Sequence, residues 1–262
     1  MSDPKADRLE YQIAEALDTE PALLPLLPDL LADLQELGTS SAEIVECLRR
    51  AGLARGSRVL DLGCGKGAVA LALAAEMGLR VDGIDGFEPF LASAREAAAE
   101  AGLGTLCDFQ PGDLLDFLGQ DRDYDAVLLL NVGPVAGDYQ STMEGLRTLV
   151  RRGGLIVLED GYLADGVPSL PDWPGYGDLA TTRRSLAAFG DEWVDELIYS
   201  VEEIRAVNER NTELIRRRAE LVKRDQPQLA PRIDEYVANQ EEETEILGRD
   251  LICALWVLRR AA

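Results

Sequence analysis

The residues best suited to chemistry lie in a short glycine-rich stretch. An apolar run ends at Asp61-Leu62 and leads into Gly63-Cys64-Gly65-Lys66-Gly67. Glycines permit positive φ and close approach of a ligand, and free N–H groups at the start of the next helix favour an anionic group. A second apolar run ends at Asp85, where a carboxylate can accept hydrogen bonds from both hydroxyls of a ribose. Together these features predict a cofactor that contains a ribose.

Composition excludes several other kinds of chemistry. The chain of 262 residues contains no histidine, which excludes a His-based triad, a His-ligated metal site and an imidazole proton shuttle. It carries 48 acidic and 26 basic residues, and this net charge of −22 disfavours contact with the phosphate backbone of nucleic acids. We therefore expect no nucleic-acid partner and no bound metal.

Cysteine spacing and apolar run length bear on the compartment. The four cysteines, which lack the CxxC spacing of a zinc site, are Cys47, Cys64, Cys107 and Cys253. Such spacing is typical of reduced thiols in the cytosol. No apolar stretch approaches the roughly 18 residues of a membrane span, and the first residues do not resemble a signal peptide. We expect a soluble, acidic, cytoplasmic protein without a membrane partner.

Alternating strands and helices must position the glycine-rich stretch. Short apolar runs predict strands at 58–62, 80–84, 105–110, 124–130, 155–159, 193–199 and 252–259. Helical patterns lie between them at 68–77, 87–101, 114–118, 139–151 and 179–189. Strands that are apolar on both faces and alternate with helices indicate a mostly parallel sheet. The expected fold class is α/β, with seven strands and helices on both faces.

Two segments lie outside this pattern. Residues 1–54 predict a helical cap, with helices at 6–17, up to about residue 37, and from a capping box at Ser40 and Glu43 to about Gly52. Residues 200–250 predict a helical hairpin inserted before the last strand, so that the core comprises 55–199 and 251–262. Its first arm has seven basic and five acidic residues, and its second has two basic and eight acidic residues. Antiparallel arms would therefore attract each other, and the hairpin is also a candidate homodimer interface.

Two cofactor classes fit the glycine-rich turn. Gly63-x-Gly65-x-x-Ala68 matches the dinucleotide fingerprint, which keeps a nicotinamide oxidoreductase open as the less favoured alternative. The order of five motifs resembles the class I S-adenosylmethionine-dependent methyltransferases, whose fold is Rossmann-like. These motifs are Asp61 before the first glycine, Asp85 after the second strand, Gly112-Asp113-Leu114 after the third, Tyr124-Asp125-Ala126-Val127 opening the fourth, and Leu149-Val150-Arg151-Arg152-Gly153-Gly154-Leu155 before the fifth.

The resemblance implies a role for each matching residue. Gly63, Gly65 and Gly67 would lie beneath the methionine part of S-adenosylmethionine, and Asp61 would lie near its ammonium group. Asp85 would hold the ribose, with Gly86 beside it, while Asp113 and the backbone of Leu114 would meet the adenine. Phe87 or Leu114 would pack on the adenine face, and Asn131 would border the methyl group. Asp113 is equally well explained as a helix N-cap, and both roles are compatible.

The expected activity is methyl transfer to a small-molecule acceptor, with S-adenosylhomocysteine as the product. Many enzymes of this kind that methylate amino groups of nucleic acids or proteins carry Asn/Asp-Pro-Pro-aromatic after the fourth strand, whereas this chain has Asn131-Val132-Gly133-Pro134. That departure argues against exocyclic-amine chemistry of this type. A non-catalytic protein that binds the cofactor and dimerises is the alternative.

Acceptor-binding residues are less clearly marked. Glu159 and Asp160 end the fifth strand, at the edge where ligands of parallel sheets bind, although a solvated loop would explain them equally well. Trp173 and Tyr176 lie in a Pro/Gly-rich loop that would either close the site or pack against the hairpin. Tyr11 could reach the site from the cap, with an ordinary helix surface as the simpler interpretation. The sequence identifies no catalytic base.

Overall fold

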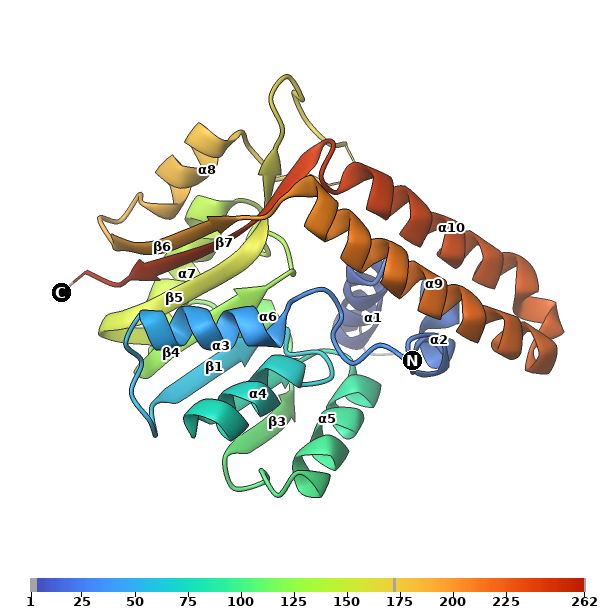
Figure 1. Ribbon diagram of the computed structural model, residues 1–262, viewed down its shortest axis with the longest axis horizontal. Coiled ribbons are helices and arrows are strands. Elements are labelled where there is room, and N and C mark those ends of the chain that lie inside the picture. Colours follow the sequence, from blue (N-terminus) through green and yellow to red (C-terminus); the bar gives the residue numbers. More distant parts are fainter. Residues whose placement is uncertain (1–3, 172, 262) are drawn as a thin grey trace.

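A seven-stranded sheet forms the centre of the protein in the computed structural model, which describes residues 4–171 and 173–261 (Figure 1). The strands are β1 (Arg58–Leu62), β2 (Arg80–Asp85), β3 (Cys107–Pro111), β4 (Tyr124–Leu130), β5 (Val150–Leu163), β6 (Glu192–Ile198) and β7 (Leu251–Arg259). Their order is β3-β2-β1-β4-β5-β7-β6, and β7 runs antiparallel to both of its neighbours. The predicted mostly parallel, seven-stranded α/β sheet is confirmed.

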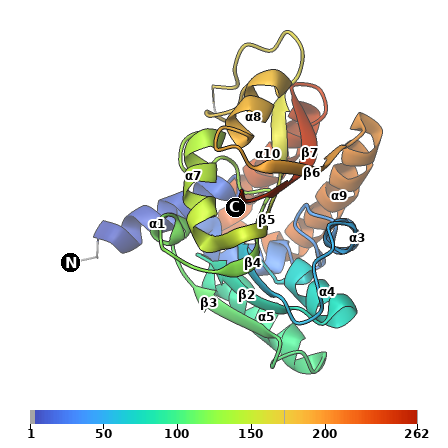
Figure 2. The same cartoon turned by 90° about the vertical axis from the view of Figure 1, so that its left-hand side faces the viewer.

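Helices cover both faces of the sheet because its strands are apolar on both sides (Figure 2). On one face lie α3 (Ser41–Arg50), α4 (Ala68–Met77) and α5 (Glu88–Glu100). On the other lie α6 (Leu114–Phe117), α7 (Tyr139–Leu149) and α8 (Leu179–Leu186). Helix α3 buries Ile44, Val45 and Leu48 in the core of the first face, so only the residues before it form a cap.

The cap packs against the inserted hairpin. The cap comprises α1 (Pro4–Ala16), a 3-10 turn η1 (Pro21–Leu26) and α2 (Leu27–Leu30), and the hairpin comprises α9 (Val201–Asp225), η2 (Pro227–Leu229) and α10 (Ala230–Ile246). One apolar cluster joins them, with Leu27 and Leu30 of the cap against Ile215, Ile233 and Tyr236 of the hairpin. The apolar stripe of the hairpin is thus buried within the chain.

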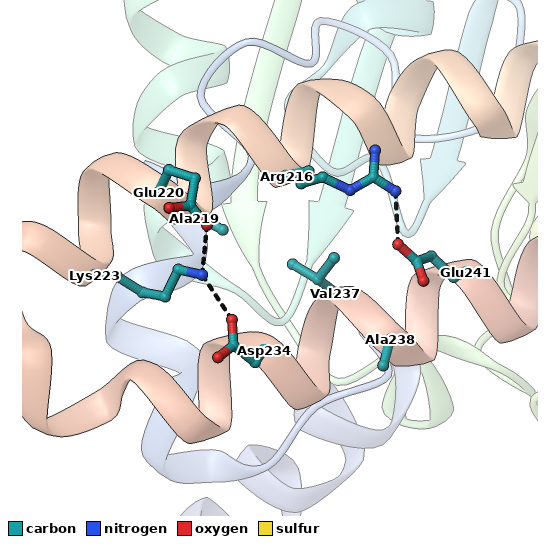
Figure 3. Close-up of a pocket in the computed structure, with 8 residues that line it drawn as sticks. All are labelled: Arg216, Ala219, Glu220, Lys223, Asp234, Val237, Ala238 and Glu241. Atoms are coloured by element: carbon teal, nitrogen blue, oxygen red, sulfur yellow. Dashed lines mark hydrogen bonds and ion pairs between the residues drawn. The ribbon is translucent and has the colours of Figure 1, made fainter.

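Charge complementarity between the hairpin arms is confirmed. Arg216 Nη2 of α9 lies 2.6 Å from Glu241 Oε1 of α10, and Lys223 Nζ lies 2.7 Å from Asp234 Oδ1. Figure 3 shows both pairs at the sides of a groove of about 260 Å³ between the two helices. Exposed pairs of this kind contribute about 0–1 kcal/mol each, so apolar packing is the main source of hairpin stability.

Several predicted element boundaries are wrong. The cap helix expected to reach residue 37 ends at Leu30, because Leu31 leaves the helical conformation, with φ of −100° and ψ of 10°, and the chain then turns. Strand β5 runs beyond the expected 155–159, since β7 continues to pair with it from Asp160 to Leu163, after its pairing with β4 has ended at Glu159. Helices α7 and α8 end earlier than expected, at Leu149 and Leu186.

The capping interactions also differ from those expected. At the start of α3, Ser40 Oγ accepts from Glu43 N at 3.4 Å, and Glu43 gives no reciprocal hydrogen bond. A complete capping box occurs instead at the start of α9, between Ser200 and Glu203. This box fixes the point at which the hairpin leaves the sheet.

A pair of carboxyl groups links the cap to the hairpin, and we expect it to make the stability of the protein depend on pH. Asp18, which follows α1, is hydrogen-bonded to Glu243 of α10. Burial, together with the charge of Asp18, raises the pKa of Glu243 to about 8. The folded state therefore holds this proton more tightly than the unfolded chain, in which a Glu titrates near pH 4.3. The associated stability is fully present below about pH 4 and is lost as the pH rises through 8.

We expect Glu243→Gln to match the wild-type melting temperature at pH 4 and to exceed it by about 2–6 °C at pH 8.5. Thermal unfolding at the two pH values measures the difference. Glu242→Gln, at the exposed neighbouring position, is the control and should follow the wild type at both. Equal melting temperatures for Glu243→Gln and wild type at pH 8.5 would contradict the prediction.

Candidate active site

The glycine-rich turn between β1 and α4 is packed too closely for side chains. Gly63, Gly65 and Gly67 have φ values of 77°, 50° and 76°, in the left-handed region that glycine tolerates. A Cβ on Gly67 would lie 2.8 Å from the Phe109 ring, and one on Gly63 would lie 2.6 Å from Val132 Cγ2. The turn therefore presents bare backbone at the carboxyl edge of the sheet, as expected for a ligand cradle.

Asp85 supports this turn from the end of β2. Its Oδ2 accepts a hydrogen bond from Gly65 N and its Oδ1 accepts one from Phe87 N, both at 2.8 Å. Burial raises the pKa of Asp85, and the backbone donors oppose that rise. The carboxylate is thus fixed beside the turn, with lone pairs left for further donors.

Asp61 at the end of β1 is the most buried carboxylate of the site. Asp61 is 2% exposed. Its carboxyl group receives no hydrogen bond or ion pair from any residue that the structure describes. Burial, together with the negative charge of Asp85, raises the pKa of Asp61 to about 7. A buried carboxylate of this kind is stabilised by a cationic ligand group.

The predicted adenine-binding residues lie beneath α1. Asp113 is the N-cap of α6, where its Oδ1 accepts from Leu115 N at 3.0 Å, and its Oδ2 accepts from Arg8 Nη2 of α1 at 3.2 Å. A Cβ on Gly86 would lie 3.1 Å from Ile13 of the same helix. Both interpretations of Asp113 therefore fit the structure.

The two apolar candidates for the adenine face differ in position. Leu114 Cδ1 would lie 3.7 Å from a Cβ on Gly63, which places its side chain over the glycine-rich turn. Phe87 is buried in the cluster between cap and hairpin, where its ring meets Phe90 edge-on at 4.8 Å. Leu114 is the better placed of the two to pack against a ligand.

Asn131 joins the end of β4 to the cap and to β5. It adopts a left-handed conformation with φ of 54°, and its Nδ2 donates to Thr39 Oγ1 at 2.8 Å and to Glu159 Oε2 at 3.4 Å. Glu159 is 5% exposed and also accepts from Tyr199 Oη at 2.7 Å. Burial raises the pKa of Glu159, and the charges of Glu43 and Glu36 add to the rise.

Asp160 points to the opposite side of β5 from Glu159, since successive side chains alternate along a strand. Its Oδ1 accepts from Tyr176 Oη and from Gly161 N, both at 2.8 Å, and Gly133 N also donates to it. Burial raises the pKa of Asp160 to about 7. The structure thus brings together Asp160 and Tyr176, two of the predicted acceptor-binding residues.

The other two predicted acceptor-binding residues are not brought to these groups. Tyr11 is 66% exposed, on the side of α1 opposite to the residues that contact Gly86, because helix positions two apart face different directions. Trp173 is half-buried in the loop after β5, with its backbone N–H bonded to Leu170 O.

Most carboxylates at the carboxyl edge of the sheet lack an ion-pair partner among the described residues. Asp191, buried elsewhere, pairs with Arg147, and at the edge Asp113 pairs with Arg8. Four others have no ion pair within the described parts of the chain: Asp61, Asp85, Glu159 and Asp160. Since uncompensated buried charge is costly, the site favours ligands that carry positive charge or hydrogen-bond donors.

Sequence reasoning missed the residues that close the site. Lys66 Nζ donates to Leu31 O at 2.5 Å and to Leu34 O at 3.0 Å, and so holds the cap over the glycine-rich turn. Thr39, Tyr199 and Arg8 were also unmarked, because their partners lie far away in sequence. Lys66 alone had a local signal, as the one charged residue inside the turn.

Within residues 4–171 and 173–261, no group of three or more Cys, Asp and Glu side chains is arranged to hold a metal ion. None of the helices in those ranges combines the length and the apolar character that crossing a membrane requires.

Comparison with known proteins gives consistent similarities. Residues 59–154 match the family described as "Methyltransferase domain". Over 109 residues the chain is 37% identical to the ubiquinone biosynthesis O-methyltransferase of Aromatoleum aromaticum, covering 41% of this chain and 45% of that protein. The chain spans less than half the length of the first curated relatives that it matches.

Two solved structures are similar over nearly the whole chain. One is a SAM-dependent methyltransferase from Geobacter sulfurreducens in complex with S-adenosyl-L-homocysteine, with a TM-score of 0.74, 20% identity, and coverage of 89% of this chain and 97% of that one. The other is the [4+2]-cyclase SpnF, with a TM-score of 0.73, 18% identity and 97% coverage of both chains. At these identities the likeness concerns the fold.

Proposed function

Residues 59–154 form a class I S-adenosylmethionine-dependent methyltransferase domain, and from this premise we propose that the protein transfers a methyl group to a small-molecule acceptor. One observation carries the proposal. Asp61, buried and without a partner among the described residues, lies beside a bare glycine-rich backbone and next to Asp85. A cofactor with an ammonium group and a ribose fits this set of groups.

The residues of the turn fit S-adenosylmethionine one by one. We assign Asp61 to the ammonium group, Asp85 to the ribose hydroxyls, and Asp113 with Leu114 to the adenine. Asn131, held by Thr39 and Glu159, borders the methionine part. When bound, the cofactor supplies a methyl group on a sulfonium for in-line displacement, with S-adenosylhomocysteine as the product. The chain's own part is to align the acceptor and exclude water, and the cap over the turn serves the second purpose.

The acceptor would lie above the ends of β4 and β5. There Glu159 and Asp160 present carboxylates without a cationic partner in the described residues, so a neutral or cationic acceptor such as an amine or hydroxyl compound is favoured. Asp160 is the better candidate for a general base, because burial raises its pKa to about 7, close to the working pH. Tyr176 would orient it.

We propose a cytoplasmic location and an outward-facing dimer surface on the hairpin. The four cysteines are free thiols, as expected for the reducing cytoplasm. A homodimer through the hairpin would use its outer surface, since its apolar stripe already packs on the cap.

The alternative is a protein that binds the cofactor without transferring its methyl group, and the [4+2]-cyclase SpnF, which shares this fold over nearly its whole length, is named for an activity other than methyl transfer. Calorimetry with S-adenosylmethionine, S-adenosylhomocysteine and NAD separates the cofactor classes, and we expect binding of the first two only. A panel of small amines, phenols and polyanions such as tRNA, assayed with labelled S-adenosylmethionine, then tests the activity. Binding without transfer to any acceptor would favour the cyclase-like or non-catalytic alternative, and transfer to tRNA alone would refute the proposed acceptor class.

A further inference from the structure

We infer that Gln12 of the cap is a cofactor-binding residue, whose side-chain amide oxygen accepts a hydrogen bond from the adenosine part of the cofactor. The inference rests on the proposed function. Gln12 lies outside residues 59–154 and belongs to none of the sequence motifs.

Helix α1 turns one side toward the candidate cofactor residues. Arg8 of this helix reaches Asp113, and Leu9 and Ile13 lie over Gly86, so this side of the helix covers the residues assigned to adenine and ribose. Side chains three and four positions apart share one side of a helix. Gln12 is four residues after Arg8 and three after Leu9, which places it between these two contacts.

Gln12 carries a buried hydrogen-bond acceptor without a donor. Gln12 Oε1 is buried, yet no donor from the part of the chain that the structure describes reaches it. A buried acceptor without a donor costs about 1–3 kcal/mol, and a bound ligand that donates a hydrogen bond to it would remove this cost. Three other buried side-chain atoms of the described residues are in this state, and none of them belongs to α1.

Two donors of adenosine lie within the region that α1 covers. One is the exocyclic amino group of adenine, which we assigned to Asp113. The other is a ribose hydroxyl, which we assigned to Asp85 beside Gly86. In both cases the group that faces α1 is a hydrogen-bond donor of a nucleoside. Analogues that lack one donor or the other distinguish the two sources.

The test is calorimetric titration of the full-length protein with S-adenosylhomocysteine. We expect Gln12→Leu to weaken binding about threefold to tenfold, the loss of one neutral hydrogen bond. Glu15→Leu, at an exposed position of the same helix, should stay within twofold of wild type. The melting temperature of ligand-free Gln12→Leu should be unchanged or higher, because the substitution removes an unsatisfied buried oxygen; a merely structural role for Gln12 would lower it.

Analogues then locate the donor. If the donor is the amino group, the wild type loses its advantage over Gln12→Leu when S-inosylhomocysteine replaces S-adenosylhomocysteine. If it is a ribose hydroxyl, the advantage persists with the inosine analogue and disappears with a deoxyribose analogue. Equal affinity of wild type and Gln12→Leu for S-adenosylhomocysteine would overturn the assignment of Gln12 alone. A wild-type protein that binds neither S-adenosylmethionine nor S-adenosylhomocysteine would overturn the proposed function as well.

Discussion

Replacing Asp85 with alanine is expected to weaken the binding of S-adenosylhomocysteine by about 100-fold or more. The carboxylate would accept hydrogen bonds from two ribose hydroxyls, and hydrogen bonds to charged groups contribute about 1.5–3 kcal/mol each. It also holds Gly65 N and Phe87 N, so its loss would loosen the turn beneath the cofactor. Calorimetry with the purified variant, alongside its melting temperature, measures the effect.

Asp82, on the same strand, provides a matched control for Asp85. It accepts a hydrogen bond from Tyr124 Oη at 2.7 Å, away from the glycine-rich turn. We expect Asp82→Ala to change the melting temperature while the affinity stays within about twofold of wild type. An Asp85→Ala variant that binds as tightly as Asp82→Ala would remove Asp85 from the ribose site.

Cofactor affinity is expected to depend steeply on pH through Asp61. Burial and the nearby charge of Asp85 raise the pKa of Asp61 to about 7 in the ligand-free protein. A bound ammonium group favours the ionised carboxylate, so binding below pH 7 must expel a proton. The affinity for S-adenosylhomocysteine should be constant above about pH 7.5 and should fall by up to about tenfold per pH unit below pH 7.

Two variants separate Asp61 from other groups that titrate in the same range. Asp61→Asn should bind weakly at all pH values and lose most of the pH dependence, because the neutral amide cannot offset the ammonium charge. Asp160→Asn should keep the wild-type profile, since Asp160 has a similar pKa but lies among Tyr176 and Gly133 instead of at the glycine-rich turn. Retention of the full pH dependence in Asp61→Asn would contradict the assignment.

The core of the fold was predictable because its signals are local. Runs such as 58–62 and 124–130 are apolar on both faces, and the structure has strands at those residues. Helix α4 also has the predicted bounds, since glycines in left-handed conformations flank it at Gly67 and Gly78. Where a boundary depended on pairing, as for β5, the sequence pattern stopped short.

The candidate site, too, was predictable where its signals are local in the sequence. Glycine spacing and the carboxylates Asp61 and Asp85 follow from one strand–turn–helix unit and its neighbouring strand, so the sequence by itself determined the cofactor class and predicted most of its contacts. The lack of histidine likewise limited any general base to other residue types, and our proposal of Asp160 depends on its burial and its contact with Tyr176 in the tertiary structure.

Only the tertiary structure decided what closes the site and what charge it bears. Arg8 meets Asp113 across 105 residues of sequence, and Tyr199 meets Glu159 across 40. No local pattern encodes such contacts, because they arise when the cap and the insertion fold back onto the sheet. The same packing turns Tyr11 to solvent and Gln12 inward, although the two are adjacent in sequence. Sequence periodicity predicts that a helix exists, but its rotation about its own axis is set by what it packs against.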